Sequence, residues 1–243
     1  MARAGLLHLA AILILAAIAG CSDDELAPAT PSDTTRVAFQ DGVSPAASYG
    51  GTEDAVLKDD PDPAAANVNY GSMPSDTLGA VPLSTAIYER RLIVRMDLTS
   101  ITDCSEVVSA RLVIRIAPLA PASMTLEAHA VNLSTWKRWT EGFGGSAAGV
   151  SWITIDGADP WQTQGGDYLS TILDARTVSS DSSVTFALSP ALVEEWIRTP
   201  SSNHGIIIKT ANAAGAAHTV VFQSEAGLAA RRPRLEIAYL PGG

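Results

Sequence analysis

Residues Trp136 to Tyr168 read WKRWTEGFGGSAAGVSWITIDGADPWQTQGGDY and contain four of the five tryptophans of the chain. Seven glycines lie among them, which makes the stretch too irregular for a helix and too rich in glycine for one continuous strand. This composition predicts a long ordered loop, held by large flat side chains, between two groups of strands. Because long ordered loops on a rigid scaffold often carry binding sites, this stretch is the first candidate for function.

The segments on either side of this loop alternate between apolar and polar residues. In residues 91–98 and 108–116 the apolar side chains fall on every second position with arginines between them, and Ile93 is the exception. A period of two predicts strands with one buried face. Further strands are predicted at residues 53–58, 124–131, 184–188, 205–210, 219–224 and 234–239. Strands of this kind, separated by turn residues, predict an all-β fold, an antiparallel β-sandwich.

One short helix is predicted in the second half of the chain. Ser189 and Pro190 suit the N-cap and the first helical position. The apolar residues that follow them have helical spacing, and Pro200 ends the pattern.

The N-terminus has the features of a secretory signal. Arg3 precedes an apolar run at residues 6–19, which is too short to favour a stable membrane span. The run ends in Ile18-Ala19-Gly20-Cys21, which resembles the lipobox of bacterial lipoproteins, where the cysteine is lipidated and becomes the first residue. An ordinary signal peptide with a chance cysteine is the alternative. Ser22 does not signal retention at the inner membrane, so the resemblance implies a lipid-anchored protein of the bacterial cell envelope, at the outer membrane or cell surface.

The composition of the chain indicates how it is divided into segments and what holds the folded part together. The expected organisation is a lipoprotein signal peptide at 1–20, a lipidated N-terminus and flexible linker at 21–51, and a single β-sandwich domain at 52–243. With Cys21 lipidated, Cys104 has no disulfide partner, so stability must come from a core of the 47% hydrophobic residues. A net charge of −10 makes the chain a poor binder of nucleic acid, since phosphate affinity depends on clustered Lys and Arg.

Several short motifs resemble, in their order and spacing, those of DNRLRE-domain proteins. The matching residues are RLIVRMDL at 91–98, VSARL at 108–112, WTEG at 139–142, PW at 160–161, GGDY at 165–168, the predicted helix at 192–196, SSNHG at 201–205 and RPRL at 232–235. The resemblance covers residues 52–239 and implies a jelly-roll-like sandwich. Some members of the family are classed as carbohydrate-binding modules with alginate-type ligands, so the resemblance also implies binding of a polysaccharide or an envelope glycan.

The tryptophan stretch supplies the candidate residues for such binding. Aromatic rings can stack on the C–H faces of pyranose sugars, and basic side chains can meet acidic sugars. The candidates are Trp136, Trp139, Trp152, Trp161 and Tyr168 for stacking, and Lys137 and Arg138 for charge. The alternative is that the tryptophans pack the loop onto the sandwich, since tryptophan is usually buried with its N–H satisfied.

Four carboxylates lie among the glycines of the same stretch. Glu141, Asp156, Asp159 and Asp167 could place several oxygens around one cation, and a structural calcium ion would suit such hard ligands. The alternative is that these side chains cap exposed N–H groups of the loop.

No catalytic motif is present. The chain has no G-x-S-x-G elbow, no H-E-x-x-H sequence and no phosphate-binding loop. The first hypothesis is therefore a non-catalytic, lipid-anchored module that binds polysaccharide or envelope glycan. The second is a structural or adhesion module that binds a protein partner through the same loop. The third is a polysaccharide-degrading enzyme, which two carboxylates could serve.

Overall fold

The structure is a computed structural model that describes residues 34–83, 86–118, 123–134, 137–179, 183–212, 218–225 and 227–242, all within the unit Asp33–Gly243. The predicted signal peptide, Cys21 and Trp136 lie outside the described residues. Within those ranges, no helix is both long enough and apolar enough to span a bilayer.

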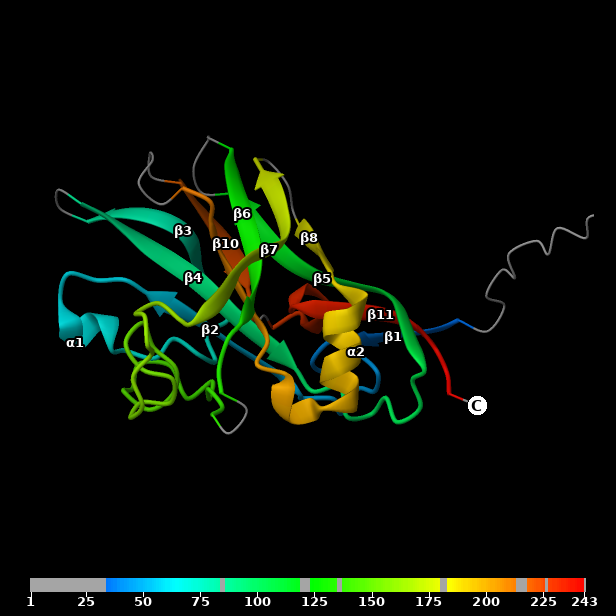
Figure 1. The fold of residues 1–243 in the computed structure, drawn as a ribbon. Coiled ribbons are helices and arrows are strands. Elements are labelled where there is room, and N and C mark those ends of the chain that lie inside the picture. Colours follow the sequence, from blue (N-terminus) through cyan, green and yellow to red (C-terminus); the bar gives the residue numbers. More distant parts are fainter. Residues whose placement is uncertain are drawn as a thin grey trace, which may run out of the picture. The chain divides into compact units, whose positions relative to one another are not determined.

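In this part of the chain, eleven antiparallel strands form two facing layers (Figure 1). The first layer has the order β1-β11-β5-β8, and the second contains β2, β3, β4, β9, β6 and β7. β10 pairs with both β3 and the end of β5, so it connects the two layers. The strands are β1 Thr35–Phe39, β2 Thr52–Lys58, β3 Ser75–Leu83, β4 Ala86–Met96, β5 Glu106–Pro118, β6 Met124–Val131, β7 Tyr168–Val178, β8 Ser183–Leu188, β9 Ile206–Thr210, β10 His218–Gln223 and β11 Arg234–Leu240. The predicted all-β, antiparallel sandwich is confirmed.

The predicted helix is α2, Pro190–Arg198, which directly follows β8. The side chains of Val193 and Trp196 on this helix are buried. The helix ends before Pro200, where the 3-10 turn η1, Pro200–Ser202, begins. A second helix, α1, Pro63–Ala66, is a single turn whose N-cap Asp62 accepts a hydrogen bond from the Ala64 N–H. A further 3-10 turn, η2, spans Ala229–Arg231.

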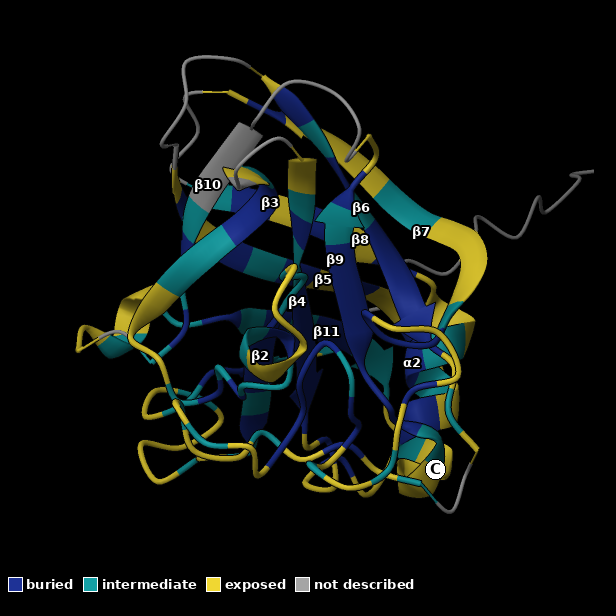
Figure 2. Ribbon diagram, turned by 90° about the vertical axis from the view of Figure 1, so that its left-hand side faces the viewer, coloured by how far each residue is buried: buried dark blue, intermediate teal, exposed yellow. Residues whose placement is uncertain are grey.

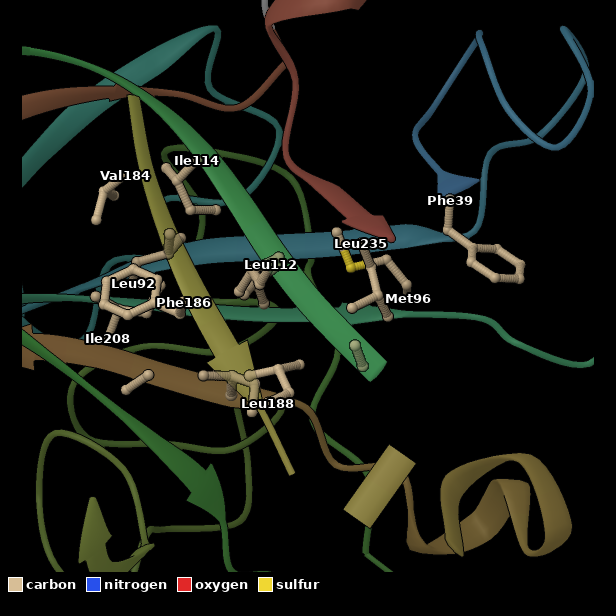
Figure 3. Packing of buried hydrophobic residues seen from close by; sticks show 14 of the residues in the cluster. Phe39, Leu92, Met96, Leu112, Ile114, Val184, Phe186, Leu188, Ile208 and Leu235 are labelled. Atoms are coloured by element: carbon tan, nitrogen blue, oxygen red, sulfur yellow. The ribbon is translucent and has the colours of Figure 1, made fainter. Parts of the chain in front are cut away.

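The main core lies between the two layers, as the alternating pattern predicts (Figure 3). In the second layer, Leu92 and Val94 of β4 lie in register with Ile208 and Ile206 of β9. They face buried side chains of the first layer, among them Leu112, Ile114, Phe186 and Leu235. At about 25 cal/mol per Å² of apolar surface removed from water, this interface is the largest source of stability in the fold.

A second core lies on the other face of the second layer. There Ile93 of β4 pairs in register with Ile207 of β9, and both side chains are fully buried. They pack with Ala55 and Leu57 of β2 and with the tryptophan loop, which in the described part of the chain covers residues 137–167. The middle of this layer is therefore buried on both faces (Figure 2), which explains why Ile93 breaks the alternating pattern.

The folded unit begins earlier than predicted. The segment assigned to a flexible linker, 21–51, contains β1, which pairs with β11 along its whole length. Phe39 is fully buried in the main core, and Asp41 accepts a hydrogen bond from the Thr52 N–H at 2.9 Å. The prediction of a linker up to residue 51 is wrong for this segment, because a short edge strand with only one large buried side chain shows little periodicity.

Substitution of Phe39 by alanine tests the contribution of β1. We expect the Phe39→Ala variant to lose about 3–5 kcal/mol of unfolding free energy, because it leaves a cavity in the main core. The measurement is urea unfolding followed by circular dichroism. The control is Val43→Ala, which truncates a side chain that is 45% exposed and should change stability by less than about 0.5 kcal/mol. Equal stability of both variants with the natural protein would show that β1 is dispensable.

Candidate functional site

Three tryptophans of the loop, Trp139, Trp152 and Trp161, are structural. Trp139 is fully buried and donates its indole N–H to the carbonyl oxygen of His204 at 2.8 Å. Trp161 is buried and donates its N–H to the Ser151 carbonyl at 2.9 Å. Trp152 is buried beneath the guanidinium of Arg91, which lies 4.7 Å from its ring centroid. The prediction that these three rings offer a stacking platform for sugars is therefore wrong, because their faces are used in the second core.

Tyr168, at the end of the loop, is half-buried and is also in contact with its neighbours. Its ring lies 4.9 Å from the ring of His129 and 5.5 Å from the guanidinium of Arg91. The adjoining Gly166 brings the loop backbone against β9, and a Cβ at this position would lie 2.4 Å from Ile207 Cδ1. Since Gly166 also has a φ of +97°, no other residue could hold the loop this close.

A buried asparagine that the sequence analysis missed holds the first part of the loop. Asn69 is fully buried, and its side-chain amide donates to the carbonyls of Glu141 and Val150 at 2.5 and 2.7 Å. Its backbone N–H donates to Ser146, and its carbonyl accepts from Gly145. The loop is thereby fixed to the chain before β3, so it is an ordered part of the fold.

The four carboxylates proposed as calcium ligands do not come together. Asp156 accepts from the N–H groups of Ala158 and Asp159, and these bonds lower its pKa. Asp167 accepts from the N–H groups of Gln162 and Thr163, Asp159 pairs with Lys137 at 3.0 Å, and Glu141 accepts from the Ser72 N–H. Within the described ranges, no group of three or more His, Cys, Asp or Glu side chains could hold a metal ion. Asp156 and Asp167 thus cap N–H groups of the loop, which was the alternative interpretation, while Asp159 forms an ion pair and Glu141 caps the Ser72 N–H outside the loop.

A buried carboxyl pair lies under the first part of the loop. Asp54 of β2 is 2% exposed and accepts a hydrogen bond from the Ser224 hydroxyl. Burial raises the pKa of Asp54 to about 7; the bond from Ser224 opposes the rise, and Glu225 and Asp41 add to it. Burial, followed by the charge of Asp54, raises the pKa of Glu141 to about 8. Both carboxyls therefore carry protons at mildly acidic pH.

A pocket lined with charged side chains lies at the end of the sandwich, beside the loop. It has a volume of about 430 Å³ and is bounded by the start of β2, the end of β4, the segment after α2, and the loop. Its polar lining includes Glu53, Arg95, Lys137, Arg138, Asn203 and His204. Two of these residues, Lys137 and Arg138, were predicted to bind sugars, and the structure places both at this pocket.

An ion-pair network forms one wall of the pocket. Glu53 bonds to Arg95 through one carboxylate oxygen and to Arg138 through the other, the latter at 2.6 Å. The guanidinium of Arg95 lies 4.8 Å from the ring centroid of the buried Trp139. The side chain of Arg138 is 66% exposed, so its remaining N–H donors face solvent. The guanidinium of Arg95 is therefore held by its neighbours, whereas the guanidinium of Arg138 is accessible to a ligand.

Two residues that line the pocket each have a buried side-chain atom without a hydrogen-bond partner among the described residues. The amide nitrogen of Asn203 donates to the Met96 carbonyl at 2.8 Å, and its Oδ1 has no partner. Nε2 of His204 likewise has none. Burial and the nearby Arg95 lower the pKa of His204, so its imidazole is neutral at pH 7. Both atoms are shielded from solvent, so neither faces the open pocket, and each buried polar atom without a partner is costly.

The sequence contained a signal for these two residues. Asn203 and His204 directly precede Gly205 and the apolar strand β9, so polar side chains stand at the entry to a buried strand. Gly205 has a φ of +83°, and a Cβ there would lie 2.2 Å from the Val94 carbonyl oxygen. The chain can therefore turn into β9 beside the pocket only at a glycine.

A scan of protein-family models and a search of curated proteins find no match to the chain. The DNRLRE resemblance thus remains a prediction.

The Trp161→Ala variant separates a structural role from a binding role. We expect it to lose about 3–5 kcal/mol of unfolding free energy, because a buried indole and its hydrogen bond are removed. Phe143→Ala is the control in the same loop; it truncates a side chain that is 79% exposed and should be close to neutral. Urea unfolding measures both. An unchanged stability of Trp161→Ala would contradict its place in the second core.

The Asp54→Asn variant tests the buried carboxyl pair. Because the folded state raises the pKa of Asp54 from 3.8 to about 7, its contribution to stability is complete below about pH 4 and disappears as pH rises through 7. We expect the natural protein to lose on the order of 2–4 kcal/mol more than Asp54→Asn between pH 4 and pH 8, because the variant keeps only the loss that the raised pKa of Glu141 contributes. The control is Glu195→Gln on the exposed face of α2. Chemical unfolding at each pH measures the slope, and identical slopes for all three proteins would refute the assignment.

Proposed function

We propose that the protein is a non-catalytic module of the bacterial cell envelope, lipid-anchored at Cys21, that binds a polysaccharide or an envelope glycan. The sugar enters the 430 Å³ pocket beside the tryptophan loop. One observation carries this proposal: Arg138, which lines the pocket, has a side chain that is 66% exposed and keeps N–H donors that its bond to Glu53 does not use. The hydroxyl and carboxylate oxygens of a sugar accept hydrogen bonds from such donors.

The charged lining favours an acidic sugar. Arg138 and Lys137 stand at the pocket, and Arg138 has N–H donors that its bond to Glu53 does not use. A guanidinium binds carboxylates in two-pronged geometry, so Arg138 can hold a uronate. The net charge of −10 repels an acidic polymer, but salt screens this repulsion beyond about 10 Å.

The assignment changes the role of the tryptophans. Trp139 stabilises the pocket from below, because its N–H bonds to the His204 backbone and its ring supports Arg95. Trp196 of α2 lines the pocket and provides an intrinsic fluorescent reporter for its occupancy.

The test is a titration of the soluble form starting at Ser22 with neutral and acidic polysaccharides, with and without calcium, followed by tryptophan fluorescence. We expect saturable binding of one acidic polymer without release of reducing ends, and a loss of affinity of about three- to tenfold in Arg138→Gln. The control is Arg176→Gln, which removes the same charge from a carboxylate-paired, exposed arginine of β7.

Three outcomes would count against the proposal. Absence of saturable binding to any polymer would refute glycan binding. Binding that Arg138→Gln and Arg176→Gln affect equally would refute the location of the site. Release of new reducing ends would show that the protein is an enzyme, which is the third hypothesis.

A further inference from the structure

The outer face of the first layer carries a groove that shares no residue with the pocket. The groove has a volume of about 530 Å³ and crosses the strands β1, β11, β5 and β8. The strand register defines two rows of side chains on this face. The first row is Arg36, Ala238 and Ser109, and the second is Ala38, Glu236, Arg111 and Ala187. Arg36 thus stands at one end of the first row beside two small side chains, and Glu236 and Arg111 stand in the middle of the second row between two alanines.

This face is basic on an acidic protein. Arg111 and Arg115 of β5, Arg36 of β1 and Arg234 of β11 project from it, and Glu236 is the only acidic residue in the groove lining. Glu236 pairs with both Arg111 and Arg234. Among the residues that the structure describes, Arg36 and Arg115 have no ion-pair or hydrogen-bond partner. Two arginines are therefore available, and two share a single carboxylate, while the chain as a whole carries −10.

The lining indicates which kind of anion fits. The residues that line the groove include no aromatic ring, and Ser109 is their only uncharged polar side chain. A sugar would find neither a stacking surface nor a set of uncharged polar groups for its hydroxyls in this groove. A protein that binds a lipid surface usually presents protruding apolar side chains, whereas this surface is hollowed and its uncharged side chains are mostly small. The groove is wide enough for an extended chain, and Arg36 and Arg111 provide positive charge along it.

We propose that this groove binds an extended acidic polypeptide segment, a run of Asp and Glu side chains on a partner protein. The segment lies across the four strands, with its carboxylates on Arg36 and Arg111. Binding depends on local charge, because the Debye length of about 10 Å at 0.1 M salt limits repulsion from the rest of the protein. The proposal goes beyond glycan binding and does not depend on it, since the groove and the pocket lie on different elements.

The probe is a fluorescein-labelled peptide of twelve glutamates, titrated with the soluble form starting at Ser22 and followed by fluorescence anisotropy. We expect saturable binding that weakens as salt rises from 0.05 to about 0.3 M, with a loss of about three- to tenfold in Arg36→Gln and in Arg111→Gln. The matched control, Arg90→Gln, removes one charge from β4 of the other layer, and should bind as the natural protein does. Circular dichroism confirms that each variant is folded.

Several results would overturn the proposal. One is absence of saturable binding at 0.05 M salt; another is an equal loss in Arg90→Gln, which would indicate a response to net charge. Two further probes identify the alternatives, polygalacturonate for an acidic glycan and phosphatidylglycerol vesicles for an anionic membrane. If either binds with the same dependence on Arg36 while the glutamate peptide does not, the partner is not a polypeptide.

Discussion

Burial of the second layer on both faces is the constraint on which the rest of the structure depends. The sheet places Ile93 and Ile207 on the face away from the main core, and these side chains would be exposed without the tryptophan loop. Three indoles, each burying a large apolar area, cover them. A loop of this length needs such contacts, because ordering its backbone costs about 1–2 kcal/mol per residue. The tryptophans and the isoleucines therefore require each other.

The same constraint determines the geometry of the pocket. The indole N–H of Trp139 fixes the backbone of His204, and its ring supports the guanidinium of Arg95. Lys137 and Arg138 directly precede Trp139, so burying its indole also places their side chains at the pocket. In the proposed site the loop therefore acts indirectly. Its aromatic residues set the position of the polar groups that line the pocket, and they need no exposure of their own.

The sequence allowed the prediction of those parts of the fold that follow from periodicity. Alternation in β5 and the apolar stripe of α2 were sufficient, because each buries one regular face. β4 and β6 also alternate in sequence over part of their length, although β4 is buried on both faces in its middle. β1 has one large buried residue, β3 contains Gly79 and Pro82, and β7 is largely exposed, so none of them shows a pattern that the sequence reveals. Ile93 could be seen as an exception, but its partner, the loop, lies far away in the sequence.

The candidate site was predictable to a smaller degree, for a physical reason. Glycines and carboxylates in a loop are compatible with a metal site, and only three-dimensional structure shows that Asp156 and Asp167 accept backbone N–H groups instead. Likewise, Asn203 and His204 each have a buried atom that lacks a partner, and no residue type reveals this in a sequence. The sandwich is asymmetric: the loop covers one outer face and leaves a polar pocket at its edge, while the other outer face carries the basic groove. Because the two surfaces share no residue, the side chains proposed to bind an acidic peptide can be changed without changing those proposed to bind a glycan.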